Sequence, residues 1–85
     1  MIEKLKVRES LINYVFEKSD LDKKEDIPLN SSLLAEGVLD SFGIIELVEF
    51  IELNWDIKIN DEEFTLEKMG SIEKMKILIE EKISS

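Results

Sequence analysis

One segment near the middle of the chain limits the possible folds most, because its apolar residues recur with the period of a helix. Asp40 and Ser41 precede them, and both residue types favour the start of a helix. At about 100° per residue, the apolar residues that follow share one narrow stripe. They are Ile44, Leu47, Val48, Ile51 and Trp55. We therefore predict a helix from residue 41 to about residue 55, with this stripe facing the core.

The rest of the chain also favours helices. Residues 3–17 carry an apolar stripe at helical spacing, made of Leu5, Ile12, Val15 and Phe16 and flanked by Leu11. After Gly70 and Ser71, a last helix repeats apolar residues at spacings of three and four: Ile72, Met75, Ile79 and Ile83. Residues 61–64 place three acids at the favourable start of a single helical turn. Residues 57–59 alternate, but three residues cannot form a sheet alone. We predict an all-α fold with three main helices and one short helix.

Residues 18–40 form a long polar connector that holds the only proline. It is longer than most loops in a compact domain, so we expect it to pack its own side chains. These are Ile27, Leu29, Leu33 and Leu34. Gly37 supplies the backbone freedom that finishes this loop.

Composition excludes several classes of function. The chain has 85 residues, enough for one domain over residues 1–85, and 11 basic against 20 acidic residues give a net charge of −9. That charge repels nucleic acid and anionic membranes and favours partners with basic surfaces. Cysteine and histidine are both absent, which excludes disulfides, thiolate or histidine metal ligands and a Ser-His-Asp triad. We expect a protein that is not an enzyme.

We expect no targeting signal in this sequence. The first ten residues lack the continuous apolar core of a signal peptide, and no apolar run is long enough to span a membrane. We expect a cytoplasmic monomer that does not insert into membranes.

The face of residues 41–55 opposite the apolar stripe has two unusual features. Phe42 points away from the stripe among Glu46 and Glu49, with Ile45 and Glu52 on its flank. An aromatic residue and an isoleucine inside an acidic ring are typical of a docking spot, unless Phe42 folds back beneath the connector. Gly43 costs about 1 kcal/mol relative to alanine in a helix. It admits close approach of another molecule, unless it is simply tolerated near a helix end.

Asp40 and Ser41 have two interpretations, helix capping or a specific site. The segment Gly37-Val38-Leu39-Asp40-Ser41-Phe42, followed by Glu46-Leu47, resembles the phosphopantetheine attachment motif of acyl carrier proteins. The resemblance covers nearly the whole chain. Residues 30–33 resemble the loop before the motif, residues 50–57 the end of the family's second helix, and residues 59–63 the acidic start of its short third helix.

The resemblance implies a four-helix acyl-carrier-like bundle whose Ser41 receives 4'-phosphopantetheine from a phosphopantetheinyl transferase. The arm brings its own thiol, so the missing cysteine is no obstacle. Such a carrier holds an acyl or aminoacyl group as a thioester and delivers it to partner enzymes. The implied partners are an activating ligase and acyltransferases or condensing enzymes with basic docking surfaces. The expected partner-binding residues are Asp40, Phe42, Ile45, Glu46, Glu49, Glu52, Glu62 and Glu63.

Alternatives remain open at this point. Phe42 stands where the family usually has leucine, and residues 37–41 are closer to carriers for D-alanine and other aminoacyl groups than to those of fatty acid biosynthesis. The alternative is therefore a carrier dedicated to D-alanylation, or to a nonribosomal peptide or polyketide pathway, rather than to fatty acid synthesis. From another class, an unmodified acidic adaptor would bind a basic helix through Phe42 and Ile45. Calcium binding is a further rival, because acids and an amide gather at Asp56, Asn60, Asp61, Glu62 and Glu63. Their spacing does not fit an EF-hand loop, which also needs a glycine that is missing here.

The net negative charge of the chain leads to a prediction about the effect of salt. Crowded acids at a net charge of −9 destabilise the free chain by mutual repulsion. Because salt screens that repulsion, the melting temperature is expected to rise between low and moderate salt, while binding to a basic partner weakens. Thermal melting at several salt concentrations checks this. A melting temperature that falls over this range would contradict the crowding of acids.

Overall fold

The computed structural model describes residues 6–84 and contains three main helices: α1 (Val7–Lys18), α2 (Ser41–Trp55) and α4 (Ile72–Ser84). Shorter pieces complete it, namely the single-turn helix α3 (Leu66–Met69) and the 3₁₀ turns η2 (Lys24–Asp26) and η3 (Asp61–Glu63). No strand occurs in this part of the chain. The predicted all-α fold with three main helices is confirmed. The first helix was predicted to begin at residue 3, and residues 3–5 lie outside the described residues.

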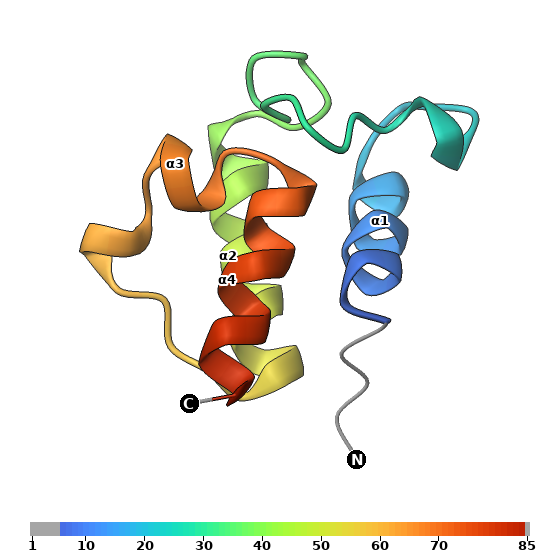
Figure 1. Cartoon of the computed structure of the whole chain (residues 1–85). Helices are drawn as coiled ribbons and strands as arrows, with labels where there is room; N and C mark the ends of the chain where they lie inside the picture. The colour runs from blue at the N-terminus through green and yellow to red at the C-terminus, as the bar shows by residue number, and fades with distance from the viewer. Residues whose placement is uncertain (1–5, 85) are drawn as a thin grey trace.

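The three main helices pack side by side, with the connector across one end. In Figure 1, α1 runs toward the connector, whereas α2 and α4 both run away from it. α1 packs chiefly on α4, and α2 contacts both of them. The start of α2 therefore lies at the connector end of the molecule (Figure 1). No helix among residues 6–84 combines the length and the apolar character that crossing a membrane requires.

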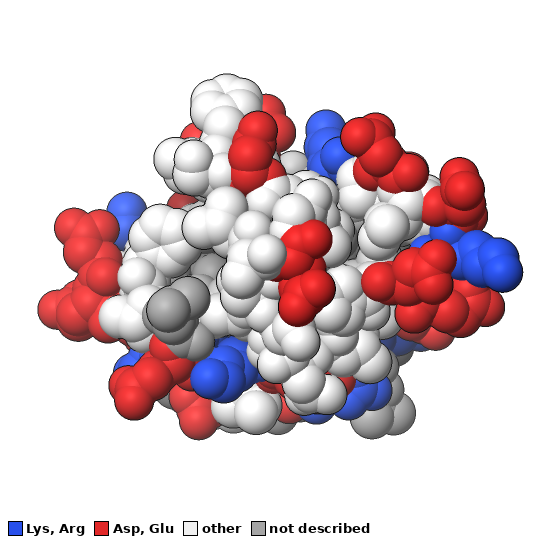
Figure 2. Space-filling model, turned by 90° about the horizontal axis from the view of Figure 1, so that it is seen from above, with Lys and Arg blue, Asp and Glu red and all other residues white. Residues whose placement is uncertain are grey.

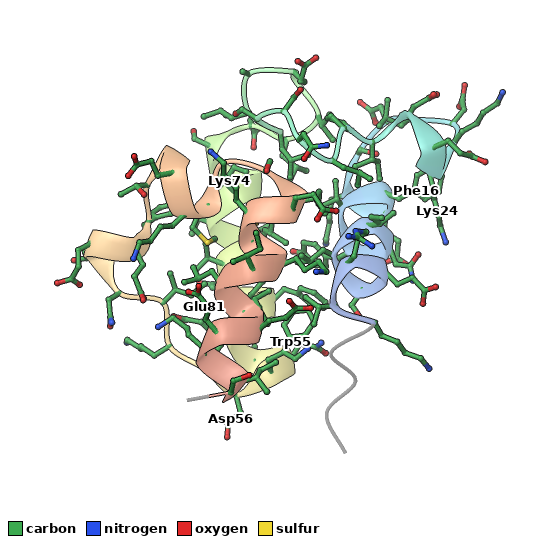
Figure 3. The ribbon with its side chains drawn as sticks, viewed as in Figure 1. Phe16, Lys24, Trp55, Asp56, Lys74 and Glu81 are labelled. Atoms are coloured by element: carbon green, nitrogen blue, oxygen red, sulfur yellow. The ribbon has the colours of Figure 1, made fainter. Side chains whose placement is uncertain are left out.

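Each main helix contributes side chains to one core. From α2, Leu47, Ile51 and Trp55 are buried as predicted, while Ile44 and Val48 are half-buried against them. Figure 3 labels Trp55 near the end of α2 that lies farthest from the connector. From α4 the core receives Ile72, Met75, Leu78 and Ile79.

The buried stripe of α1 differs from the predicted one. Its buried line is Val7, Leu11 and Val15, at spacings of four residues. Ile12 and Phe16 are only half-buried, and Leu5 lies outside the described residues. Phe16 is only half-buried because it faces the connector. The Lys24 ammonium of η2 lies 5.9 Å from the centroid of the Phe16 ring (Figure 3).

The connector packs much as expected, with one error. Ile27 and Leu33 are buried and Leu29 is half-buried, but Leu34 is half-exposed rather than packed inside. The backbone turns back at Leu33, whose carbonyl accepts the N–H groups of Val38 (2.9 Å) and Leu39 (3.3 Å). Gly37 has a φ of +76°, so its predicted role in this loop is confirmed.

Polar contacts join the periphery to α4. Arg8 forms two hydrogen bonds with Glu73, one of them from Nη2 to Oε1 at 3.1 Å, and Lys82 Nζ lies 2.8 Å from Glu63 Oε1. These hydrogen bonds hold the pKa of the Glu73 and Glu63 carboxyls below the usual glutamate value. Ion pairs at the surface contribute little to stability, so the apolar core determines it.

Truncating the core and the outer face of α2 is expected to give different results. Leu47→Ala or Ile51→Ala removes a fully buried side chain and should lower the free energy of unfolding by about 2–5 kcal/mol. Phe42→Ala and Ile45→Ala alter exposed side chains and should change it by about 0.5 kcal/mol or less. Urea denaturation of the four variants measures this difference. A Phe42→Ala variant as unstable as Leu47→Ala would place Phe42 in the core.

Candidate functional site

A tight turn in the connector positions the start of α2. Ser32 Oγ accepts the Ala35 N–H at 3.1 Å, and the Ser32 carbonyl accepts the Glu36 N–H at 2.9 Å. Leu33 and Leu39, at either side of this turn, are both buried. Because both ends of the turn are anchored in the core, Asp40 has a fixed position.

Asp40 caps α2. Its backbone is extended, and its Oδ1 accepts the Gly43 N–H at 2.8 Å. Its carbonyl accepts the Ile44 N–H at 3.0 Å. These are the two hydrogen bonds expected of an N-cap residue. The sequence left open whether Asp40 or Ser41 caps the helix, and in the structure Asp40 is the cap.

Ser41 is consequently available for other chemistry. It is the first residue of the 15-residue helix α2 and is exposed. Within the described part of the chain, no group forms a hydrogen bond with its hydroxyl. The unpaired N–H groups and the positive end of the helix dipole lie at this end of α2, where they favour an anion.

Gly43 has an explanation within the chain itself. A Cβ at this position would lie 3.3 Å from Asp40 Oδ1 and 3.3 Å from the Leu39 Cβ. Close approach of another molecule stays a prediction, and the structure adds a contact within the chain. Gly43 lets the capping carboxylate and the buried Leu39 lie against the first turn of α2.

The outer face of α2 is apolar and acidic, as predicted. The Phe42 side chain is 67% exposed and that of Ile45 is 51% exposed, so Phe42 is not folded beneath the connector. Glu49 is exposed and Glu46 half-exposed, and neither forms an ion pair with a described residue. Burial raises the pKa of Tyr14 on α1, and the charges of these two carboxylates raise it further. Seen from the connector end, Figure 2 shows acidic side chains on both sides of a broad, mainly uncharged area, with further acidic side chains within it.

Two of the other predicted partner-binding acids form hydrogen bonds within the chain. Glu52 Oε2 accepts the Ile59 N–H at 2.8 Å, which closes the loop after α2. Glu63 accepts the Asn60 N–H at 3.0 Å and pairs with Lys82. Glu62 is exposed on η3. Glu52 and Glu63 thus have structural partners of their own, whereas Asp40, Phe42, Ile45, Glu46 and Glu49 lie together on α2 and its cap.

Two hollows flank the start of α2. One, of about 180 Å³, is mainly apolar and is lined by Leu33, Leu34, Ile44, Phe64 and Met69 among others. The other, of about 500 Å³, is open and more polar, with a lining that includes Lys18, Asp20, Val38, Asp40 and Phe42. The first hollow could not be predicted from the sequence, because the half-exposed Leu34 and Phe64 lie in loops without helical periodicity.

The acids after α2 do not form a metal centre. Among residues 6–84, no group of three or more acidic side chains has an arrangement that could hold a metal ion. Asp56 instead ends α2 in the left-handed region, at φ 54°, and its N–H donates to the Glu52 carbonyl.

Comparison with known proteins identified no family for this chain, so a functional assignment has to rest on the residues described above. No protein-family model matches the chain, and no curated protein gives a significant match.

Substitutions can test whether Asp40 caps α2 and Ser41 does not. Asp40→Ala removes the cap and should lower the free energy of unfolding by about 1 kcal/mol, whereas Asp40→Asn keeps an acceptor and should lower it less. Ser41→Ala should change it by about 0.5 kcal/mol or less, because the hydroxyl has no partner to lose. Chemical denaturation of the three variants provides the comparison. A Ser41→Ala variant that loses as much as Asp40→Ala would identify Ser41 as a cap.

Proposed function

We propose that the chain is a monomeric, cytoplasmic carrier protein of the acyl-carrier type, in which Ser41 bears a covalent 4'-phosphopantetheine. One observation carries this proposal. At the start of α2, Asp40 satisfies the helix end, and the neighbouring Ser41 hydroxyl is exposed and without a partner. A serine retained beside a residue that already caps the helix fits the attachment motif that residues 37–42 resemble.

The surroundings of Ser41 suit a phosphodiester. The first-turn N–H groups and the dipole of the 15-residue α2 favour negative charge at this hydroxyl. The exposure of Ser41 leaves room for an attached group. When attached, phosphopantetheine supplies a terminal thiol that holds an acyl or aminoacyl group as a thioester.

Attachment requires a partner enzyme. Within the described residues, no side chain contacts the Ser41 hydroxyl as a base, and the adjacent Asp40 carboxylate is engaged by Gly43. A phosphopantetheinyl transferase therefore has to supply the catalytic groups. Phe42, Ile45, Glu46 and Glu49 beside Ser41 offer an apolar and acidic surface to a basic partner. The same surface would receive the activating ligase and the acyltransferase or condensing enzymes.

The apolar hollow bears on the cargo. Ile44 lies one helical turn from Ser41 and forms part of the hollow's lining. An apolar recess within reach of the attachment point favours an acyl group with a short apolar chain. A D-alanyl group, or another small aminoacyl group, has no need of the recess, and it remains the alternative cargo suggested by residues 37–41.

An unmodified adaptor is the second candidate. The observation that favours it is the exposure of Phe42 and Ile45 among unpaired acids, which would bind a basic helix without any prosthetic group. The two candidates differ in the mass of the protein, because only a carrier gains a phosphopantetheinyl group.

Co-expression with a promiscuous phosphopantetheinyl transferase tests the proposal. Intact mass spectrometry should show one added phosphopantetheinyl group on the wild type and none on Ser41→Ala. Ser31→Ala is the matched control, since Ser31 is also exposed and lies in the connector, and it should be modified normally. Uptake of the group by Ser41→Ala, or a wild type left unmodified where a known carrier is modified, would refute the assignment.

A further inference from the structure

Leu53 is a large apolar side chain that the core does not use. It is 85% exposed, more than Phe42, Ile45 or Ile77. Leu53 lies eleven residues beyond Phe42 on α2. At about 100° and 1.5 Å per residue, the two side chains lie within about 20° of each other around the helix and about 16 Å apart along it.

Two acids lie between Leu53 and Phe42 on the same side of α2. Relative to Phe42, Glu46 is turned by about 40° and Glu49 by about 20° in the other direction. Neither has an ion-pair partner among residues 6–84. We call Phe42, Glu46, Glu49 and Leu53 the docking line. A single exposed leucine is ordinary, but here two exposed apolar side chains bracket two unpaired carboxylates on one helix face.

We propose that the phosphopantetheinyl transferase binds the whole docking line, with Phe42 and Leu53 as two apolar anchors and Glu46 and Glu49 meeting basic side chains between them. This inference rests on the proposed function and adds the second anchor and the length of the contact. The transferase surface that fits has two apolar recesses about 16 Å apart, separated by Lys or Arg. Charge complementarity points to such a partner, because the chain carries a net charge of −9 and the two carboxylates are unpaired.

Another exposed apolar residue provides the comparison. Ile77 on α4 is 52% exposed, yet it lies in a hollow whose lining includes Lys74 and Glu81, one of each charge. Both of these side chains project from α4 in Figure 3. Ile77 therefore has basic as well as acidic side chains beside it. A polar substitution at Ile77 controls for general effects of changing an exposed apolar residue.

The test measures phosphopantetheinylation of Ser41 by the transferase encoded in the same genome, with coenzyme A as donor, over a range of carrier concentrations. Leu53→Asn should raise KM about tenfold, the loss expected for an anchor residue. Its kcat should stay at the wild-type value, because Leu53 lies about 18 Å along the helix from Ser41. Leu53→Met should restore the wild-type KM, and Ile77→Asn should leave it unchanged. Melting curves verify that the variants are folded.

The possible outcomes separate this inference from the proposed function. If the wild type is modified and Leu53→Asn has the same KM as Ile77→Asn, the second anchor is wrong while the carrier assignment stands. If Leu53→Asn lowers kcat without raising KM, Leu53 does not act by docking. A wild type that the transferase does not modify, although a control carrier is modified, overturns both.

Discussion

The hydrogen bond from the Gly43 N–H to Asp40 Oδ1, 2.8 Å long, is the contact on which the site depends. It provides the side-chain cap of α2, so the adjacent Ser41 hydroxyl is not used as the cap. Gly43 gives this contact room, since a Cβ at position 43 would lie 3.3 Å from both the carboxylate and Leu39, closer than most such contacts. Leu39 and Leu33 in turn anchor the connector to the core, so the core, the turn and the cap together determine where Ser41 lies.

The acidic residues divide into two groups with different roles. Glu52, Glu63 and Glu73 each accept hydrogen bonds that join loops and helices to one another. Glu46 and Glu49 have no such partner among the described residues, and they lie beside the exposed Phe42 and Ile45. Internal partners reduce what the first group can offer another protein. The second group retains its charge for a basic surface, which is why the proposed partner contacts are concentrated on α2.

The sequence predicted best where a helical period was strong. The stripe of α2 and the exposure of Phe42 followed from 3.6-residue periodicity, whereas N-cap chemistry did not choose between Asp40 and Ser41 as the cap. The length of the connector suggested that Leu34 would pack inside it, and this was wrong because a tight turn decides which side chains of residues 33–39 point inward. Periodicity could not show that Ile59 engages Glu52 or that Lys82 engages Glu63, since both contacts join segments brought together only by folding. Leu53 lies on the face of α2 opposite the predicted apolar stripe. Its angle around the helix relative to Phe42 follows from the sequence alone, once the helix is predicted.

The mass of the chain isolated from its own organism tests the central claim most directly, because it requires no chosen partner and no variant. The account predicts that a fraction of the protein carries one phosphopantetheinyl group, alone or bearing a thioester-linked cargo, on the proteolytic peptide that contains Ser41. The cargo's mass would distinguish an acyl group from an aminoacyl group. A chain found entirely unmodified in growing cells, or modified only on another residue, would contradict the assignment of Ser41 as the attachment point.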